Sequence, residues 1–361
     1  MRGSPPVQEL LHWMVQSEAS DLHLSFGSPP IYRRNGALTP HATLDPLGRD
    51  DLLDVLAVVA SDPDRRRLEE TRELDKSLEV EAIGRFRVNV AFERGHLWFS
   101  FRRINESVLS LEDLGLPEAC DRLTRLPRGL VVVTGPTGSG KSTTLASMID
   151  RINEREARHI VTIEDPIEFV HVNKRSIINQ REVGVDTVSF AAALRHVLRQ
   201  DPDVILVGEM RDLDTIGSAI TAAETGHLVF ATLHTPDAPQ TVDRIVDAFP
   251  GTQQQQVRLQ LSMVLEGIVS QMLIADTSGE GRVVACEVML ATPAVRNLIR
   301  ESKTHQISTA MATGAALGMR TLDQQLADLV KRRLISRETA LASARSPEEL
   351  DRLVGGSQHA A

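Results

Sequence analysis

A glycine-rich segment that directly follows an apolar run carries the strongest chemical signal in this chain. Residues 128–143 read RGLVVVTGPTGSGKST, so the spacing G-x-x-x-x-G-K-S stands between an expected strand and an expected helix. Glycines lack a Cβ, and a loop of them can turn successive backbone N–H groups toward phosphate oxygens at a helix N-terminus. Lys141 adds a positive charge near the β- and γ-phosphates, and the Ser142 hydroxyl can ligate Mg²⁺. The segment predicts a nucleoside triphosphate site made of Gly135, Pro136, Thr137, Gly138, Ser139, Gly140, Lys141, Ser142 and Thr143.

Two acidic residues follow apolar runs farther along the chain. Glu164 comes after the run 160–163, twenty-three positions beyond Lys141, which leaves room for one crossover helix and a return to a neighbouring strand. Hydrolysis of a γ-phosphoryl group needs a residue that orients the attacking water, and Glu164 is placed for that role, although an acid that caps a proline turn has the same pattern. Glu209 follows the run 204–207 in the form of a Walker-B strand, and we expect it to hold the Mg²⁺ shell through water.

Basic and imidazole side chains complete the candidates in this half of the chain. Arg195 and Arg199 share a helix face by their i,i+4 spacing; they could face solvent, pair with Asp201 and Asp203, or neutralise a transferring phosphoryl group. His227 precedes an apolar strand and His234 follows it, with no third ligand near enough for a zinc site. We expect both histidines to form hydrogen bonds with nucleotide phosphate or with the acids around them.

Two segments with alternating apolar residues, near residues 86–92 and 97–101, predict a hairpin. If they fold about Arg94-Gly95 as a two-residue turn, Arg87 lies directly opposite Arg102, on the face away from the phenylalanines. Like charges in register cost stability. This face is therefore either a solvated arginine surface or one that awaits an anion.

The elements that must position these residues fall into two groups. The first hundred residues read as a small α+β domain. Beyond them, apolar runs that alternate with helical segments predict a mainly parallel sheet covered on both faces, with ligand residues at the strand ends. The last third reads as helical, including an apolar stripe over 257–272 and a capping box over 346–349. The expected division is an N-terminal domain over 1–103, a linker over 104–117, an ATPase domain with C-terminal helices over 118–355, and a tail over 356–361.

Composition excludes several classes of protein. The 361 residues exceed what one core usually organises, and two cysteines provide neither a disulfide framework nor zinc spacing, as expected in a reducing cytosol. No run reads as a signal peptide or reaches bilayer length, so we expect any membrane association to go through a partner or a surface. The net charge of −9 argues against bulk attraction to nucleic acid.

Taken in order, these motifs resemble those of the secretion ATPase superfamily, the hexameric P-loop motors of type II secretion and type IV pili. Residues 162–168 resemble its aspartate box, and residues 226–234 resemble its histidine box. The segments SDLHL at 20–24, PAVRNLIRE at 293–301 and GMRTLD at 318–323 are similar to those of PilT-type retraction ATPases. The resemblance covers nearly the whole chain.

The resemblance implies an α/β fold, with a RecA-like P-loop ATPase domain and a smaller N-terminal PAS-like α+β domain. It implies ATP and Mg²⁺ as cofactors, Glu164 as the catalytic glutamate and Glu209 as the Walker-B acid. It also implies that six further residues contact phosphate: Arg87, Arg102, Arg195, Arg199, His227 and His234.

The function implied by the resemblance is a hexameric motor that couples ATP hydrolysis to type IV pilus retraction and twitching motility. The implied partners are further copies in a homohexamer, an inner-membrane pilus platform protein and a paralogous retraction ATPase, with the chain cytoplasmic at the inner-membrane face. The alternatives are a pilus-assembly or type II secretion ATPase and a nucleotide-binding accessory subunit of such a motor. A RecA-like nucleic-acid motor is disfavoured by the acidic net charge, and we expect no direct nucleic-acid partner.

Overall fold

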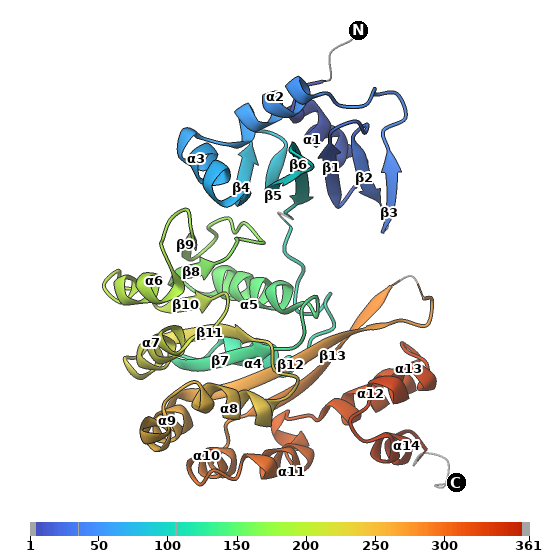
Figure 1. Cartoon of the computed structure of the whole chain (residues 1–361). Helices are drawn as coiled ribbons and strands as arrows, with labels where there is room; N and C mark the ends of the chain where they lie inside the picture. Colours follow the sequence, from blue (N-terminus) through green and yellow to red (C-terminus); the bar gives the residue numbers. More distant parts are fainter. Residues whose placement is uncertain (1–4, 35, 105–106, 280, 356–361) are drawn as a thin grey trace. The chain divides into compact units, whose positions relative to one another are not determined.

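The chain forms two compact units in the computed structural model, which describes residues 5–34, 36–104, 107–279 and 281–355 (Figure 1). Unit 1 comprises residues 1–107 and 166–170, and unit 2 comprises residues 108–165 and 171–361. The expected tail over 356–361 lies outside the described residues, as do positions 105 and 106 of the expected linker.

Unit 1 is built on a six-stranded antiparallel sheet with the strand order β3-β2-β1-β6-β5-β4. Its strands are β1 (Asp21–Ser25), β2 (Ile31–Arg34), β3 (Ala37–Pro40), β4 (Glu73–Val80), β5 (Gly84–Glu93) and β6 (His96–Arg103). Its helices are α1 (Val7–Gln16), α2 (Arg49–Val59) and α3 (Asp62–Thr71).

The β5–β6 hairpin has the register that the sequence predicts. Arg94 and Gly95 form its two-residue turn with φ of +51° and +84°, as a turn that matches the twist of the strands requires. Arg87 is therefore directly opposite Arg102. The opposite face of the sheet supplies the core of unit 1, which includes Phe86, Val88, Phe99 and Phe101, all fully buried.

Unit 2 is built on a seven-stranded sheet with the order β13-β12-β7-β11-β10-β8-β9. Its strands are β7 (Gly129–Thr134), β8 (His159–Glu164), β9 (Ile177–Glu182), β10 (Val204–Val207), β11 (Leu228–Leu233), β12 (Leu265–Ala275) and β13 (Arg282–Leu290). Six strands run parallel, and β13 pairs antiparallel with β12 at one edge.

Helices cover both faces of the unit 2 sheet, as predicted. Leu130 and Val132 of β7 lie in one buried cluster, and Val131 and Val133 lie in another. Because alternate residues of a strand point to opposite faces, each face has its own core. The helices are α4 (Glu118–Thr124), α5 (Lys141–Arg155), α6 (Phe190–Val197), α7 (Leu213–Glu224), α8 (Ala238–Asp247), α9 (Gly251–Val264), α10 (Pro293–Arg300), α11 (Ile307–Thr313), α12 (Leu322–Lys331), α13 (Arg337–Ser343) and α14 (Pro347–Gly355), with short 3₁₀ turns η1 (Thr304–Gln306) and η2 (Ala315–Leu317).

The expected helical stripe over 257–272 is wrong in its second half. Helix α9 ends at Val264, and strand β12 begins at Leu265 and pairs with β7 and β13. The residues 265–275, LEGIVSQMLIA, are apolar at both helix and strand spacing, so periodicity does not separate the two states. Gly267 lies so close to Leu123 that a Cβ would meet its Cδ2 at 2.9 Å, a packing constraint that only the folded sheet reveals.

The last three helices pack on the far ends of β12 and β13 in a separate cluster that includes Ile274, Leu326 and Leu350. Half of the predicted capping box is present: Ser346 Oγ accepts a hydrogen bond of 3.3 Å from the Glu349 N–H at the start of α14, but the Ser346 N–H donates a 3.1 Å hydrogen bond to Oδ2 of Asp323 instead of to the Glu349 side chain. None of the helices in the described part of the chain has the length and apolarity needed to cross a bilayer.

Candidate active site

The loop between β7 and α5 depends on three glycines for its shape. Gly135, Gly138 and Gly140 have φ of +140°, +78° and +89°, values that residues with a Cβ rarely adopt. A Cβ on Gly135 would also lie 2.1 Å from the carbonyl oxygen of Gln271 on β12. The loop leads directly into the first turn of α5, whose amide groups have no acceptor within the helix. This is the geometry that binds phosphate.

Gln271, which was not among the predicted site residues, supports the loop from β12. Its buried side-chain amide donates a hydrogen bond of 2.7 Å to the carbonyl oxygen of Ser139. Because β12 stands next to β7 in the sheet, this contact joins residues more than a hundred positions apart. No local sequence signal could have indicated it.

The ammonium group of Lys141 lies inside the loop. It donates hydrogen bonds of 2.8 Å and 3.0 Å to the carbonyl oxygens of Gly135 and Pro136, and it lies 3.4 Å from Nδ1 of His234. A buried cation requires such partners. Ser142, the next residue of α5, is exposed.

His234 connects Lys141 to Glu209. Nε2 of His234 lies 3.1 Å from Oε1 of Glu209, which is also 2.7 Å from Nε of Arg211. Lys141 can only donate, so Nδ1 of His234 must accept, and this assigns the ring proton to Nε2, which donates to Glu209. The two residues at the carboxyl ends of β10 and β11 and the lysine of the loop thus form one continuous chain of contacts.

Glu209 is ionised in this arrangement. Burial opposes its ionisation, but the hydrogen bond and charge of Arg211, together with the hydrogen bond from His234, outweigh burial and hold the pKa of the carboxyl below its ordinary value. An ionised carboxylate at this position is suited to contact a hydrated cation. Arg211, two positions after Glu209, was not among the predicted site residues.

Glu164 ends β8, the strand beside β10. Its Oε1 accepts hydrogen bonds of 2.6 Å from the buried Thr162 hydroxyl and 3.1 Å from the Gln180 amide. Ile163 pairs with Val207, so Glu164 and Glu209 follow the same edge of the sheet on neighbouring strands. The alternation along β8 could have indicated Thr162, because residues two apart share a face, whereas Gln180 comes from β9 and required the fold.

His227 lies apart from these residues. It precedes β11, whereas His234 follows it, and the six residues of that strand span about 20 Å. Nδ1 of His227 is 2.9 Å from the carbonyl oxygen of Ala222 and 3.1 Å from the Thr225 hydroxyl. Within one chain, the fold brings His234 to Lys141 and leaves His227 at the opposite edge of the sheet.

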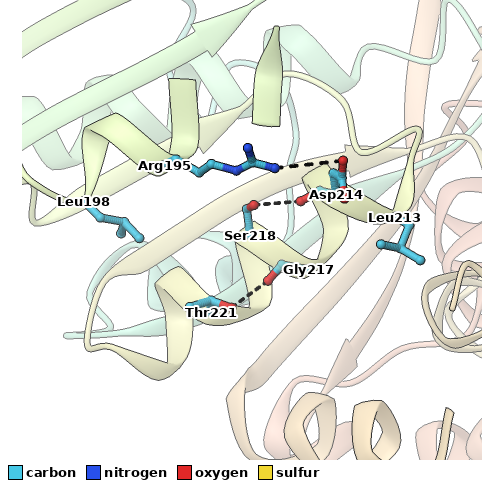
Figure 2. A pocket seen from close by; sticks show the side chains of 7 residues that line it. All are labelled: Arg195, Leu198, Leu213, Asp214, Gly217, Ser218 and Thr221. Atoms are coloured by element: carbon cyan, nitrogen blue, oxygen red, sulfur yellow. Dashed lines mark hydrogen bonds and ion pairs between the residues drawn. The ribbon is translucent and has the colours of Figure 1, made fainter. Parts of the chain in front are cut away.

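The expectation of a shared helix face for Arg195 and Arg199 is wrong. Helix α6 ends at Val197, and Arg199 follows in a turn that precedes Asp201, which has a φ of +55°. Arg195 instead points toward α7, where its Nη2 lies 4.0 Å from Oδ2 of Asp214 (Figure 2). Both side chains of this pair are exposed, so it contributes little to stability.

The surface around Arg195 is hollowed. A cavity of about 290 Å³ is bounded by Arg195, Leu198, Leu213, Asp214, Gly217, Ser218 and Thr221 (Figure 2). It lies between α6 and α7 and includes none of the phosphate-loop residues.

The remaining predicted arginines are in unit 1. Arg87 is exposed on β5, and Nε of Arg102 on β6 lies 2.8 Å from Oδ1 of Asp21 on β1. Asp21 belongs to the segment SDLHL, for which the sequence predicted a family resemblance but no chemical role.

The model of the Type II/IV secretion system protein family matches residues 7–317. The chain belongs to this family. As a Type II/IV secretion system protein it is 51% identical over 342 residues to the "Type IV pilus retractation ATPase PilT" of Pseudomonas aeruginosa, covering 95% of this chain and 99% of the relative. It is 49% identical over 337 residues to the "Twitching motility protein" of Neisseria gonorrhoeae, covering 93% and 89% of the two chains.

The fold is similar to that of a solved structure, "Crystal Structure of the Pilus Retraction Motor PilT and Bound ADP". The match covers 97% of this Type II/IV secretion system protein and 100% of the solved chain, with a TM-score of 0.91 and 47% sequence identity. This similarity confirms the predicted fold class, an α/β RecA-like ATPase domain with a smaller N-terminal α+β domain. The resemblance to PilT-type retraction ATPases drawn from the motifs is also confirmed.

Proposed function

We propose that this protein is an ATP-hydrolysing motor that drives type IV pilus retraction. The observation that carries the proposal is the unbroken contact from Lys141 of the phosphate loop through His234 to Glu209. These contacts bring a loop suited to phosphate and an acid suited to a hydrated cation to one place, and hydrolysis of a nucleoside triphosphate requires both. The name of the Pseudomonas relative, a retraction ATPase, supports the same function.

The chain's own residues have distinct roles in the proposed reaction. The glycine loop, the first turn of α5 and the Lys141 ammonium hold the phosphates of ATP. Ser142, with its exposed hydroxyl, and the ionised Glu209 are an oxygen donor set suited to Mg²⁺, which when bound neutralises charge on the β- and γ-phosphate oxygens. Glu164, held by Thr162 and Gln180, orients the attacking water.

Further contacts to phosphate are part of the proposal. Arg87, Arg102, Arg195, Arg199 and His227 are assigned to phosphate by their motif positions. We retain the division into an N-terminal domain over 1–103, a linker over 104–117, an ATPase domain over 118–355 and a tail over 356–361. The proposed working form is a cytoplasmic homohexamer that acts at the inner membrane on a pilus platform protein, together with a paralogous retraction ATPase.

The test is a steady-state ATPase assay on the purified full chain. Lys141→Ala should abolish nucleotide binding, and Glu164→Gln should abolish turnover while ATP still binds, because the amide cannot accept a proton from water. Glu69→Gln, an exposed glutamate of α3, serves as the matched control and should keep full activity. Full hydrolysis by Glu164→Gln would contradict the catalytic assignment. Deleting the gene should increase the number of surface pili, whereas an assembly motor would leave fewer.

A further inference from the structure

A line of charged side chains crosses the face of unit 1 opposite its aromatic core. Arg33 on β2 is in register with Asp21 on β1, Asp21 with Arg102 on β6, and Arg102 with Arg87 on β5. Residues directly opposite each other in antiparallel strands point to the same face. We call these four residues the arginine row. It has three guanidinium groups and one carboxylate.

Asp21 is the buried member of the arginine row, only 4% exposed. Its Oδ1 accepts the 2.8 Å contact from Nε of Arg102, and its Oδ2 accepts a 2.8 Å hydrogen bond from the Ser20 hydroxyl. Nε of Arg33 lies 3.6 Å from the same Oδ2. Burial opposes ionisation of Asp21, but the hydrogen bonds from Ser20 and Arg102 outweigh it and hold the pKa of the carboxyl below its ordinary value.

Arg102 is held by Asp21 but remains accessible. Its side chain is 67% exposed, although its Nε is bound to the carboxylate. Among the described residues, Asp21 is its one ion-pair partner. The terminal Nη groups of a guanidinium held by Nε form the edge that binds a phosphate oxygen pair. Asp21 therefore fixes the direction of the side chain and competes for its charge.

The in-register position of Arg87 explains why a carboxylate is needed here. Two guanidinium groups opposite each other on neighbouring strands repel, and Asp21 on the other side of Arg102 offsets that repulsion when no anion is bound. A bound oxyanion would also offset the repulsion between the two arginines, and its negative charge would then be repelled by the carboxylate of Asp21.

We propose that Asp21 is a positioning residue that aims Arg102 and competes for it with the γ-phosphate of a nucleoside triphosphate. The proposal rests on the proposed function, in which Arg102 contacts that phosphate. ADP has no γ-phosphate, so Asp21 affects the affinity for ATP and leaves the affinity for ADP unchanged. Asp21 thereby sets how strongly the protein discriminates between the two nucleotides.

The experiment is isothermal titration of the full chain with a non-hydrolysable ATP analogue and with ADP, each with Mg²⁺. Asp21→Asn keeps the shape of the side chain and a hydrogen-bond acceptor for Ser20 but removes the charge. Asp21→Asn should lower the dissociation constant of the ATP analogue about threefold to tenfold and change the dissociation constant of ADP by less than about twofold. In the Arg102→Gln background, Asp21→Asn should have no effect on the analogue.

Asp75→Asn is the matched control, because Asp75 is an exposed aspartate on β4 of the same sheet, hydrogen-bonded to Asn89. It should leave both affinities unchanged. Thermal unfolding checks that each variant folds, and Asp21→Ser, which also removes the charge, should shift the analogue affinity in the same direction.

The outcomes separate this proposal from the function on which it rests. Suppose that Arg102→Gln weakens binding of the ATP analogue, but Asp21→Asn leaves the affinities for both nucleotides unchanged or changes both equally. The proposed role of Asp21 is then overturned, and that of Arg102 stands. If Arg102→Gln changes neither nucleotide, the phosphate role of Arg102 is overturned, and the competition with Asp21 is overturned with it.

Discussion

Nε2 of His234 lies 3.1 Å from Oε1 of Glu209, and the other nitrogen of the same ring lies 3.4 Å from the Lys141 ammonium. The imidazole can accept from the lysine and donate to the glutamate only with its proton on Nε2. Movement of Lys141 toward a phosphate would release Nδ1, so the ring is positioned to respond to nucleotide binding.

We therefore expect His234→Phe to lower kcat about tenfold to a hundredfold, because Lys141 and Glu209 both lose the imidazole nitrogens that link them. Affinity for a non-hydrolysable ATP analogue should change less than about threefold, since the loop itself is intact. Steady-state kinetics and titration measure the two effects. His305→Gln, at an exposed histidine, is the control, and an unchanged kcat in His234→Phe would remove this residue from the reaction.

Thr162 provides a second test of how the catalytic carboxylate is held. Its buried hydroxyl donates a 2.6 Å hydrogen bond to Oε1 of Glu164, and valine has the same shape without the donor. Thr162→Val should lower kcat about tenfold with KM unchanged, whereas Thr162→Ser, which keeps the hydroxyl, should restore most of the rate. Equal kinetics for the two variants would show that the hydroxyl has no positioning role.

The predictions that succeeded depended on local rules. The two-residue turn at Arg94-Gly95 fixes the Arg87–Arg102 pairing by strand geometry alone. The spacing of Gly135, Gly140 and Lys141 likewise defines a loop between a strand and a helix. In both cases the relevant residues are close in sequence, so tertiary context has little room to change the outcome.

The predictions that failed, and the contacts that were missed, depend on partners distant in sequence. Strand β12 is a strand because β7 and β13 offer it hydrogen bonds on both sides, which the apolar pattern of 265–275 does not show. Arg199 leaves the helix face because the chain must turn before Pro202 to enter β10. Gln180 and Gln271 reach the site from β9 and β12, and glutamine alone has no recognisable signature.

Gly135 tests the packing of the phosphate loop against β12. A Cβ there would lie 2.1 Å from the Gln271 carbonyl oxygen, and its φ of +140° is unsuited to alanine. Gly135→Ala should lower the free energy of unfolding by more than about 1 kcal/mol and abolish nucleotide binding. Gly251→Ala, at the start of α9 with open space around the position, should be neutral or stabilise by about 0.5 kcal/mol. Denaturant unfolding compares the pair, and equal effects would refute the packing argument.

His171 makes the stability of unit 2 depend on pH. Burial lowers its pKa to about 4, with Asp150 opposing and Lys174 assisting the shift. In the unfolded chain this histidine is protonated below about pH 6.5, whereas in the folded chain it stays neutral down to about pH 4. The unfolding free energy therefore falls as pH drops below about 6.5 and stops falling near pH 4. Between pH 7 and pH 5 this amounts to about 1 to 2 kcal/mol.

We accordingly expect His171→Gln to lose less unfolding free energy than the parent between pH 7 and pH 5. Urea unfolding at the two pH values measures the difference. The exposed His305→Gln should follow the parent. Parallel pH profiles for His171→Gln and the parent would mean that the histidine is not held neutral.

An ion pair between a partly exposed arginine and a buried carboxylate joins the C-terminal helices to the segment that follows His234. Nη1 of Arg345 lies 2.6 Å from Oε2 of Glu287, a residue only 2% exposed on β13, and Nη2 donates a 2.8 Å hydrogen bond to the Pro236 carbonyl oxygen. Glu287 Oε1 accepts from the Ala238 N–H at the start of α8. Burial raises the pKa of Glu287, and Arg345 opposes that shift.

Arg345→Gln should therefore destabilise the protein by about 2 to 4 kcal/mol at pH 7, because it leaves a buried carboxylate without its cation. Because the pKa of Glu287 is raised in the folded protein, ionisation of this carboxyl lowers the unfolding free energy as pH rises above its pKa in the unfolded chain. The unfolding free energy lost in Arg345→Gln should therefore be smaller near pH 5 than at pH 7. Adding Glu287→Gln should recover at least about 1 kcal/mol, since a neutral amide needs no counter-ion. Arg337→Gln, which breaks the exposed pair with Asp351, should cost less than about 0.5 kcal/mol, and an equal cost at Arg345 would contradict the argument from the buried Glu287 carboxylate.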